Sequence, residues 1–350
     1  MSDTPERPVA LVAGAAGIIG NAAAHELADN GWIVRGLGRH ALDNLDTVQA
    51  DLTDPEATKT ALAAAADTTH LFYAALKPGE DLAAEAEENG RMLANLLDGL
   101  EHVGAPLQRV VIYQGFKIYG IHLGANVRTP ARESDPPHMP PNIYQAQEAQ
   151  LAARAERADW DYVALRPDVV VGDVYGNAMN IALVIGVFAE ISRALNIPLR
   201  FPGTDRAYEQ MVQTTDAGLL ARASLWAANE APAGEAYNVT NADTFRWARL
   251  FPDVAEHLGL ELAEPVPLDL VTHMADKKAL WRELANKHNL VEPDLGKLVG
   301  WGFGDFVFKT ETDVVSDTNK IYAAGFIERR DSSTSLLAAI DSLKAKKIIP

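Results

Sequence analysis

Short apolar runs alternate with helical segments through the first half of the chain. The runs that we interpret as strands occupy residues 9–13, 32–38, 47–52, 69–75, 108–114 and 161–172. Residues 21–28 and 55–66 are rich in alanine, residues 80–103 repeat leucine at helical spacing, and 142–151 form a further helical stretch. This regular order of strand and helix predicts an α/β fold with a Rossmann-type, doubly wound parallel sheet.

After residue 180 the pattern becomes less regular. We therefore predict a Rossmann domain over residues 1–179 and a smaller, mainly helical lobe, the substrate-binding lobe, over 180–350. Segments within 201–247 are expected to return to the sheet. Residues 180–195 and 266–309 are aliphatic and aromatic, which favours a small apolar substrate.

Composition narrows the functional classes. The 350 residues are 48% hydrophobic, so a large core is available, and the formal charge of −17 argues against nucleic acid or an anionic membrane as a partner. The chain has no cysteine, which excludes disulfides and thiolate catalysis. The nine histidines show no metal-ligand spacing, so no metal is expected. The first eight residues lack the apolar core of a signal peptide, and no stretch is long and apolar enough to span a bilayer, so we expect a cytoplasmic protein.

A glycine motif follows the first apolar run. Gly14, Gly17 and Gly20 stand in the spacing Gly-x-x-Gly-x-x-Gly, between a strand and a helix. Glycine permits the tight turn and the close approach of a pyrophosphate, and the helix N-terminus offers free N–H groups to it. The motif predicts a dinucleotide site, although a tight turn of an unrelated α/β protein has the same pattern.

The end of the second strand indicates which dinucleotide binds. NAD-selective sites usually carry an acidic residue there, which accepts from the ribose 2′-hydroxyl. This chain has Arg39 and His40, which suit a 2′-phosphate. We expect NADPH as the cofactor; the alternative is that Arg39 is an ordinary solvated loop residue.

Tyr144 and Lys117 are the candidate catalytic pair. Short-chain dehydrogenases usually place a lysine four residues after the catalytic tyrosine, but Glu148 occupies that position here. A carboxylate there is expected to raise the tyrosine pKa, so another residue must supply the cation. Lys117 lies just after the fifth strand, where ordinary extended enzymes have a serine at the position of Gly115. Taken singly, Tyr144 reads as a packing residue and Lys117 as a surface residue.

Together these residues resemble the progesterone 5β-reductase/iridoid synthase-like family of atypical short-chain dehydrogenases/reductases. The lysine supplied by the strand turn, with the helical lysine absent, is the specific mark of that family. The residues that carry the resemblance are the glycine loop, Arg39, Asp51, Leu52, 69–73, Asn89, Gly115, Lys117, Tyr119, Asn142, Tyr144, Glu148, Arg166, Pro167, Met179, Asn180, 201–203, 226–228, 238–247, Gly325, Phe326 and 347–350.

The resemblance implies a site for NADPH and an activity. Tyr144 and Lys117 would be catalytic, Arg39 and His40 would hold the 2′-phosphate, Asp51 and Leu52 the adenine, and the segment after the sixth strand the nicotinamide. The cofactor-binding residues implied in this way are Gly14, Ala16, Gly17, Ile18, Ile19, Gly20, Arg39, His40, Asp51, Leu52, Ala75, Leu76, Tyr113, Val170, Asn177, Ala178 and Met179. Arg166-Pro167 would lie near the nicotinamide, or would be a structural turn.

The function implied is NADPH-dependent reduction of an α,β-unsaturated carbonyl compound, with hydride added at the β-carbon and Tyr144 stabilising the enolate oxygen. Reduction of an aldehyde or ketone by the same pair is the alternative. A protein that senses NADP(H) without catalysis is a third possibility, and the absence of a serine at 115 and a lysine at 148 disfavours a sugar-nucleotide epimerase. Leu76 and Gln145 stand where plant members often have Trp and Tyr, so steroid or iridoid specificity is not transferred. A homodimer is compatible with the family.

Overall fold

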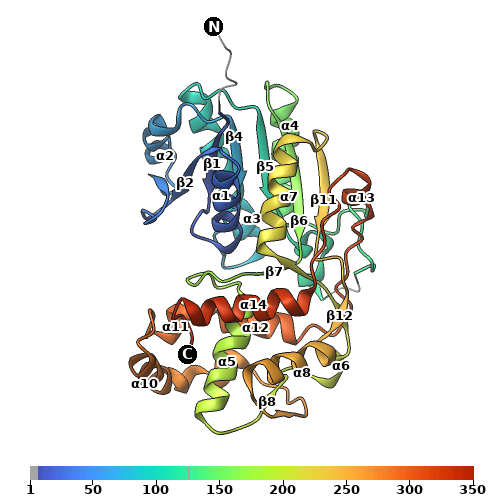
Figure 1. Ribbon diagram of the computed structural model, residues 1–350. Coiled ribbons are helices and arrows are strands. Elements are labelled where there is room, and N and C mark those ends of the chain that lie inside the picture. Colours follow the sequence, from blue (N-terminus) through green and yellow to red (C-terminus); the bar gives the residue numbers. More distant parts are fainter. Residues whose placement is uncertain (1–6, 125–126) are drawn as a thin grey trace.

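The computed structural model describes residues 7–124 and 127–350 (Figure 1). Most of the N-terminal segment examined for a signal peptide lies outside the described residues. Seven parallel strands form the main sheet, in the order β11-β6-β5-β4-β1-β2-β3. The strands of this sheet are β1 Val9–Ala13, β2 Ile33–Gly38, β3 Asp46–Gln49, β4 His70–Tyr73, β5 Arg109–Tyr113, β6 Asp161–Pro167 and β11 Glu235–Val239. The predicted α/β Rossmann fold is confirmed.

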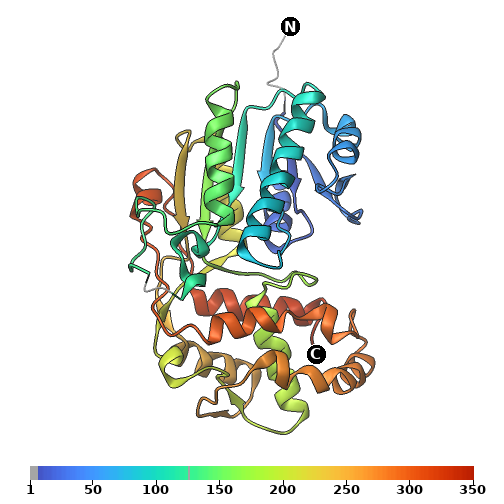
Figure 2. The ribbon, with the colours of Figure 1, turned by 180° about the vertical axis from the view of Figure 1, so that it is seen from behind.

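Helices cover both faces of the sheet, so its central strands are buried on both sides. The helices α1 (Ile18–Asp29) and α7 (Ala217–Asn229) lie side by side on the face turned toward the viewer in Figure 1. The helices α2 (Pro55–Leu62), α3 (Leu82–His102) and α4 (Ile143–Ala155) cover the other face, which Figure 2 shows. Two separate apolar cores result, one on each side of the sheet.

Side chains at the helix starts explain where two of these helices begin. Asp81 caps α3 by accepting hydrogen bonds from the N–H groups of Ala83 and Ala84. Asn142 caps α4 in the same way, through the N–H groups of Tyr144 and Gln145. A side-chain oxygen at this position satisfies amides that the helix cannot pair internally.

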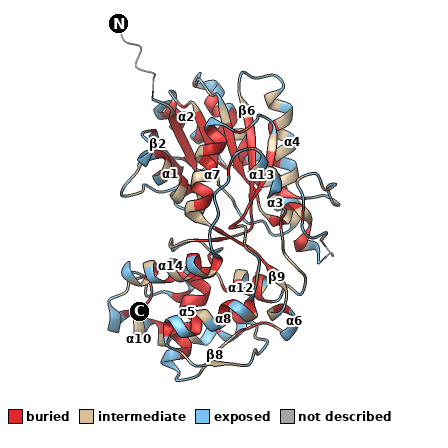
Figure 3. Cartoon of the chain, turned by 45° about the vertical axis from the view of Figure 1, so that its right-hand side comes forward, coloured by how far each residue is buried: buried red, intermediate tan, exposed pale blue. Residues whose placement is uncertain are grey.

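The lower half in Figure 1 consists mainly of helices. Its core includes an aromatic cluster in which the ring of Phe201 lies 5.1 Å from that of Phe251 and 5.2 Å from that of Phe308. Figure 3 shows this buried core as separate from that of the sheet. The helices are α5 Ile181–Ala194, α6 Asp205–Tyr208, α8 Trp247–Leu258, α9 Leu270–His273, α10 Lys278–His288, α11 Leu295–Leu298, α12 Trp301–Phe308 and α14 Ser332–Ala345.

Six further short strands of the described residues lie outside the main sheet. They form three two-stranded sheets, which pair β7 with β10, β9 with β12 and β8 with β13. Their bounds are β7 Val169–Val171, β8 Leu199–Arg200, β9 Met211–Val212, β10 Thr214–Asp216, β12 Phe245–Arg246 and β13 Leu262–Ala263. The remaining elements are α13 Asn319–Ala323 and the 3-10 turns η1 Ala63–Ala65, η2 Phe116–Tyr119, η3 Ile121–Leu123 and η4 Ala275–Lys277.

The chain passes between the halves several times. It leaves the sheet at α5, returns through β10, α7 and β11, and crosses again to α8. Further on, α13 packs beside β11 before α14 runs through the lower half. Two segments after residue 180, α7 and β11, are therefore part of the sheet layer. Across the described ranges, no helix combines the length and the apolar character needed to cross a membrane.

Candidate active site

The glycine motif forms a turn of backbone atoms between β1 and α1. Gly14 has a φ of +81°, and a Cβ there would lie 2.7 Å from the carbonyl oxygen of Ala74. A Cβ at Gly20 would lie 2.3 Å from the carbonyl oxygen of Gly14. Gly17 begins α1 without a side-chain cap, and the first turn holds no acidic residue. The first amides of α1 and its positive dipole end are therefore available to an anion.

Two loops approach this glycine turn from other parts of the sheet. The loop after β4 contacts it, since a Cβ at Gly14 would lie 2.9 Å from the nitrogen of Ala75. The loop after β7 contacts it as well, because a Cβ at Gly17 would lie 3.5 Å from Nδ2 of Asn177. The structure thus brings residues of three predicted segments to one edge of the sheet.

Asn89 of α3 fixes the backbone that follows β4. Asn89, which is completely buried in α3, accepts a hydrogen bond from the N–H of Lys77 and donates one to its carbonyl oxygen, at 2.8 and 2.7 Å. These two bonds fix the backbone that follows Ala75 and Leu76. We expect this role to explain why the resemblance includes Asn89.

Arg39 and His40 follow β2 and are exposed. Asp51 stands near Arg39 at the end of the neighbouring strand, where its carboxylate accepts hydrogen bonds from the N–H and hydroxyl of Thr53. These bonds, with smaller contributions from Lys77 and Arg39, lower the pKa of Asp51. The Arg39 guanidinium, the His40 imidazole and an ionised carboxylate therefore face solvent at the β2–β3 end of the sheet.

Tyr144 projects from the first turn of α4 toward the exit of β5. A Cβ at Gly115 would lie 3.2 Å from the Tyr144 hydroxyl oxygen and 3.6 Å from a ring carbon. Gly115 therefore gives the phenol the space that the serine of ordinary extended enzymes would occupy. Burial raises the pKa of Tyr144 well above its usual value, and the charge of Glu85 raises it further.

Lys117 stands in η2, two residues beyond Gly115. Its carbonyl oxygen accepts a hydrogen bond of 2.9 Å from Asn142, the residue that caps the Tyr144 helix. Its Nζ forms an ion pair of 3.0 Å with Glu85 on α3. The backbone of Lys117 is thus tied to the start of α4, while its ammonium group is directed to α3.

Glu148 has a different role from the one we expected. Its carboxylate accepts hydrogen bonds from Arg166 (2.9 Å) and Gln114 (2.8 Å), and the Arg166 side chain is only 8% exposed. The carboxylate that raises the pKa of Tyr144 is Glu85 and not Glu148. Arg166 joins β6 to α4 and to the exit of β5, and its place near the nicotinamide stays a prediction.

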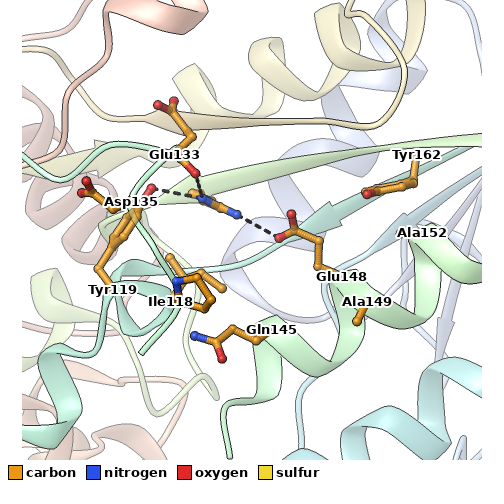
Figure 4. A pocket seen from close by; sticks show the side chains of 11 residues that line it. Ile118, Tyr119, Glu133, Asp135, Gln145, Glu148, Ala149, Ala152 and Tyr162 are labelled. Carbon is orange, nitrogen blue, oxygen red and sulfur yellow. Dashed lines mark hydrogen bonds and ion pairs between the residues drawn. The ribbon is translucent and has the colours of Figure 1, made fainter. Parts of the chain in front are cut away.

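Arg166 and Glu148 border a hollow of about 510 Å³ (Figure 4). Gln145, Glu148, Ala149 and Ala152 contribute one face of α4 to it. Tyr144 is not among its lining residues. The acidic side chains of Glu133 and Asp135 also border it. It is therefore distinct from the edge of the sheet where the glycine turn and Tyr144 lie.

The other predicted site residues take varied positions. The Tyr113 hydroxyl donates to Ser224 inside the α1/α7 core, so only its backbone can face a cofactor. Val170 and Leu52 are buried, whereas Ile19, Leu76 and Asn177 are partly exposed. Ala16, Ala178 and Met179 are exposed. Ala178 also contacts the lower half, because a Cβ at Gly300 would lie 2.2 Å from its carbonyl oxygen.

Glu85 and the partners of Glu148 were not predicted from the sequence. Glu85 is one of several acidic residues at the start of α3, and nothing in its local pattern distinguishes it. Its only sequence signal is its distance of one helical turn from Asn89. The Arg166–Glu148 pair joins a strand to a helix and is visible only in three dimensions.

The residues of this edge fit a dinucleotide. The glycine turn leaves no room for side chains, as a pyrophosphate-binding turn requires, and the free first amides of α1 supply hydrogen-bond donors. Exposed Arg39 and His40 lie at the end of β2, and a partly buried phenol lies at the exit of β5. The arrangement can hold an anionic dinucleotide and donate a hydrogen bond to a substrate placed beside Tyr144.

Solved structures with a similar fold include two UDP-glucose 4-epimerases. The UDP-glucose 4-epimerase of Thermotoga maritima, solved with UDP-glucose, has a TM-score of 0.70 and 17% identity, over 96% of this chain and 99% of that one. The Thermus thermophilus UDP-glucose 4-epimerase, solved with NAD, has a TM-score of 0.65 and 20% identity, over 96% and 99% of the two chains. At such low identity these likenesses establish the fold alone.

Sequence relatives are considerably closer. The chain is 33% identical to a 3-oxo-Delta(4,5)-steroid 5-beta-reductase of Arabidopsis thaliana, over 98% of this chain and 93% of that protein. It is 32% identical to an (S)-8-oxocitronellyl enol synthase of Camptotheca acuminata, over the same shares. A family model described as a PRISE-like Rossmann-fold domain matches residues 28–350. The chain therefore belongs to the PRISE-like family of Rossmann-fold proteins.

Proposed function

We propose that this protein is an NADPH-dependent reductase of α,β-unsaturated carbonyl compounds. That it is an oxidoreductase of the short-chain dehydrogenase/reductase superfamily follows from its family and its relatives. The finer proposal concerns the cofactor, the bond that is reduced and the residues that act. One observation carries it: the Tyr144 hydroxyl lies against Gly115, at the same edge of the sheet as the glycine turn.

Two further features support the proposal. The relative from Arabidopsis thaliana is named for a 3-oxo group, a double bond at positions 4 and 5, and a 5-beta-reductase activity, which together describe reduction of an enone. Arg39 and His40 are exposed at the end of β2, where a 2′-phosphate would lie in a Rossmann site. Charge-assisted hydrogen bonds from a guanidinium suit that group.

The protein's own residues would bind and orient the reactants. The amides at the start of α1 would hold the pyrophosphate, and Asn177 would approach it from the loop after β7. The nicotinamide, when bound, supplies the hydride. Tyr144 would donate a hydrogen bond to the substrate oxygen, where negative charge develops during reduction. The raised pKa of Tyr144 keeps its proton in place, as this role requires.

The same residues can serve two reactions. If the β-carbon of the substrate receives the hydride, Tyr144 stabilises an enolate oxygen and need not release its proton. If the carbonyl carbon receives it, Tyr144 passes a full proton to the oxygen. A phenol with a raised pKa keeps its proton, which suits a hydrogen bond to an enolate oxygen, and it is a weaker acid for the second reaction. Enone reduction is therefore the form of the proposal that we adopt.

The product formed from an enal tests the proposal. Purified protein is incubated with NADPH and citral, and the products are separated and identified by mass spectrometry. We expect the saturated aldehyde. Allylic alcohol as the main product would replace enone reduction by carbonyl reduction. Tight NADPH binding without turnover across a panel of enones and aldehydes would indicate a non-catalytic NADP(H)-binding protein.

A further inference from the structure

The ion pair between Lys117 and Glu85 joins the candidate catalytic site to α3. The two charged atoms are 3.0 Å apart, and the Glu85 side chain is only 14% exposed. The Tyr144 hydroxyl lies beside Gly115, two residues before Lys117, because a Cβ at Gly115 would lie 3.2 Å from the hydroxyl oxygen. The charge of Glu85 adds to the burial that raises the pKa of Tyr144. Three elements, α3, η2 and α4, thus place a carboxylate, an ammonium and a phenol in one cluster.

The position of Glu85 is fixed by its backbone. Its N–H donates to the carbonyl oxygen of Asp81, the cap of α3, at 2.9 Å. Its own carbonyl oxygen accepts from the side chain of Asn89 at 2.8 Å. Gly79 packs directly over it, because a Cβ there would lie 2.4 Å from the Glu85 nitrogen. The carboxylate is therefore presented from a rigid helix start and not from a mobile loop.

We propose that Glu85 is a positioning residue of the active site, which holds the Lys117 ammonium on the α3 side and keeps the Tyr144 hydroxyl protonated as a hydrogen-bond donor. This inference rests on the proposed role of Tyr144 in reduction. It assigns a function to a residue outside the tyrosine–lysine pair.

The groups that face Glu85 come from three elements. They are Lys117 in η2, Tyr144 in α4 and His122 in η3, with the ring of His138 lying 5.5 Å from that of His122. Burial lowers the pKa of His122, and the charge of Lys117 lowers it further, so this imidazole is neutral at neutral pH. Lys117 and Glu85 are then the opposite charges of the cluster, joined by the 3.0 Å ion pair.

Burial and the nearby carboxylate favour the neutral phenol. A lysine directed at the phenol would favour tyrosinate, which cannot donate a hydrogen bond to a substrate oxygen. The ion pair directs the Lys117 ammonium to Glu85 instead, and burial of Tyr144 together with the charge of Glu85 raises the pKa of the phenol. The pair therefore suits an enzyme that reduces its substrate and needs a protonated tyrosine over a wide pH range.

The pH dependence of turnover tests this role. Glu85→Gln keeps the shape of the side chain and removes its charge. The alkaline limb of the kcat profile, measured with saturating NADPH, should move to lower pH by about one pH unit or more relative to the unmodified protein. Glu87→Gln, on the exposed side of the same helix, is the matched control and should leave the profile unchanged. Glu85→Asp restores the charge and should restore most of the profile.

A spectroscopic measurement separates this inference from the proposed function. The tyrosines are replaced by a fluorotyrosine, whose phenol ionises at lower pH, and the Tyr144 signal in fluorine NMR is assigned by its loss in Tyr144→Phe. Glu85→Gln should lower the pH at which this signal titrates, and Glu87→Gln should not. An unchanged Tyr144 titration in Glu85→Gln would overturn the inference, whatever the activity. A shifted titration with an unshifted kcat profile would support Glu85 but contradict the catalytic role of Tyr144.

Discussion

At the scale of single residues, Tyr144 is the group on which the proposed chemistry depends. Its hydroxyl lies against Gly115 at the exit of β5. Tyr144→Phe removes the donor and should lower turnover by about 10²- to 10⁴-fold, the range typical of a lost acid–base group. Carbonyl reduction should suffer more than enone reduction, since only the former needs the proton. Steady-state kinetics with saturating NADPH provides the measurement.

The control for this substitution is Tyr162→Phe. Tyr162 borders the hollow on the other side of Arg166 and does not lie at the glycine edge. Its loss should leave turnover within about twofold, as is usual for a residue outside a catalytic unit. Near-full activity of Tyr144→Phe on every substrate would remove Tyr144 from the mechanism.

Arg39 governs the choice of cofactor in the same proposal. It is exposed at the end of β2 and is therefore free to turn toward a phosphate. A charge-assisted hydrogen bond contributes about 1.5–3 kcal/mol, so Arg39→Ala should weaken NADPH binding by about 10-fold or more. NADH binding should change little. Dissociation constants from the fluorescence of the bound reduced cofactor check this.

Arg282→Ala is the matched control for Arg39. It removes the same charge from an exposed position on α10 in the lower half, and both dissociation constants should remain unchanged. Equal losses of NADPH and NADH affinity in Arg39→Ala would contradict the 2′-phosphate assignment.

At the scale of elements, the sequence predicts the sheet half well and the site only partly. The strand expected at 108–114 is Arg109–Tyr113, and the helix expected at 80–103 is Leu82–His102. These agree because each is a local pattern, a buried run or a leucine repeat. The partners of Glu85 and Glu148 depend on how α3 and α4 pack against the sheet, and no local pattern encodes that.

The ion pair between Arg166 and Glu148 also determines what the substitution Glu148→Lys would do. With Glu148 in the lysine position of ordinary enzymes, Glu148→Lys looks like a way to restore the missing cation. The structure places Arg166 at 2.9 Å from that carboxylate, so a lysine there would oppose a buried guanidinium and leave it unpaired. Removing one partner of a buried pair is strongly destabilising. Loss of fold would therefore obscure any gain in catalysis.

The junction of β6 and β7 carries a pH-dependent element. Asp168 is buried there; one carboxylate oxygen accepts from the N–H of Val169 at 2.7 Å, and the other has no partner within the described residues. Burial raises the pKa of Asp168 to about 7. Because the folded pKa exceeds the unfolded one, this group stabilises the fold below about pH 4, and the stabilisation disappears as the pH rises toward 7.

Asp168→Asn should remove this dependence. The free energy of unfolding of the variant, relative to the unmodified protein, should increase between pH 4 and 7 by up to about 1.4 kcal/mol per pH unit. Urea denaturation at several pH values measures the difference. Asp159→Asn, an exposed position before β6, should show no such trend. A constant difference across this range would contradict the raised pKa of Asp168 in the folded protein.

At the scale of the whole molecule, segments of the two halves alternate along the chain. The strand β11 pairs with β6 at the edge of the sheet, and α7 covers the face beside α1. Both follow α5, the first helix of the lower half, along the sequence. We retain the division at residue 180 as a proposal about binding roles, with the NADP(H) site before it and the substrate lobe mostly after it. That division does not imply two units that fold independently.

Truncation after residue 179 tests this distinction. The fragment 1–179 lacks α7 and β11, so the apolar face formed by α1 and the sheet, including Leu27, Phe72 and Val163, loses its cover. Exposed apolar surface of this kind should prevent a stable fold. We expect the fragment to show no cooperative thermal transition by circular dichroism and no NADPH binding. The fragment 1–241 keeps both elements and should regain part of the thermal transition and part of the NADPH binding. The full chain should unfold in one transition. A cooperative, NADPH-binding fragment 1–179 would show that the sheet half folds without the segments that return to it.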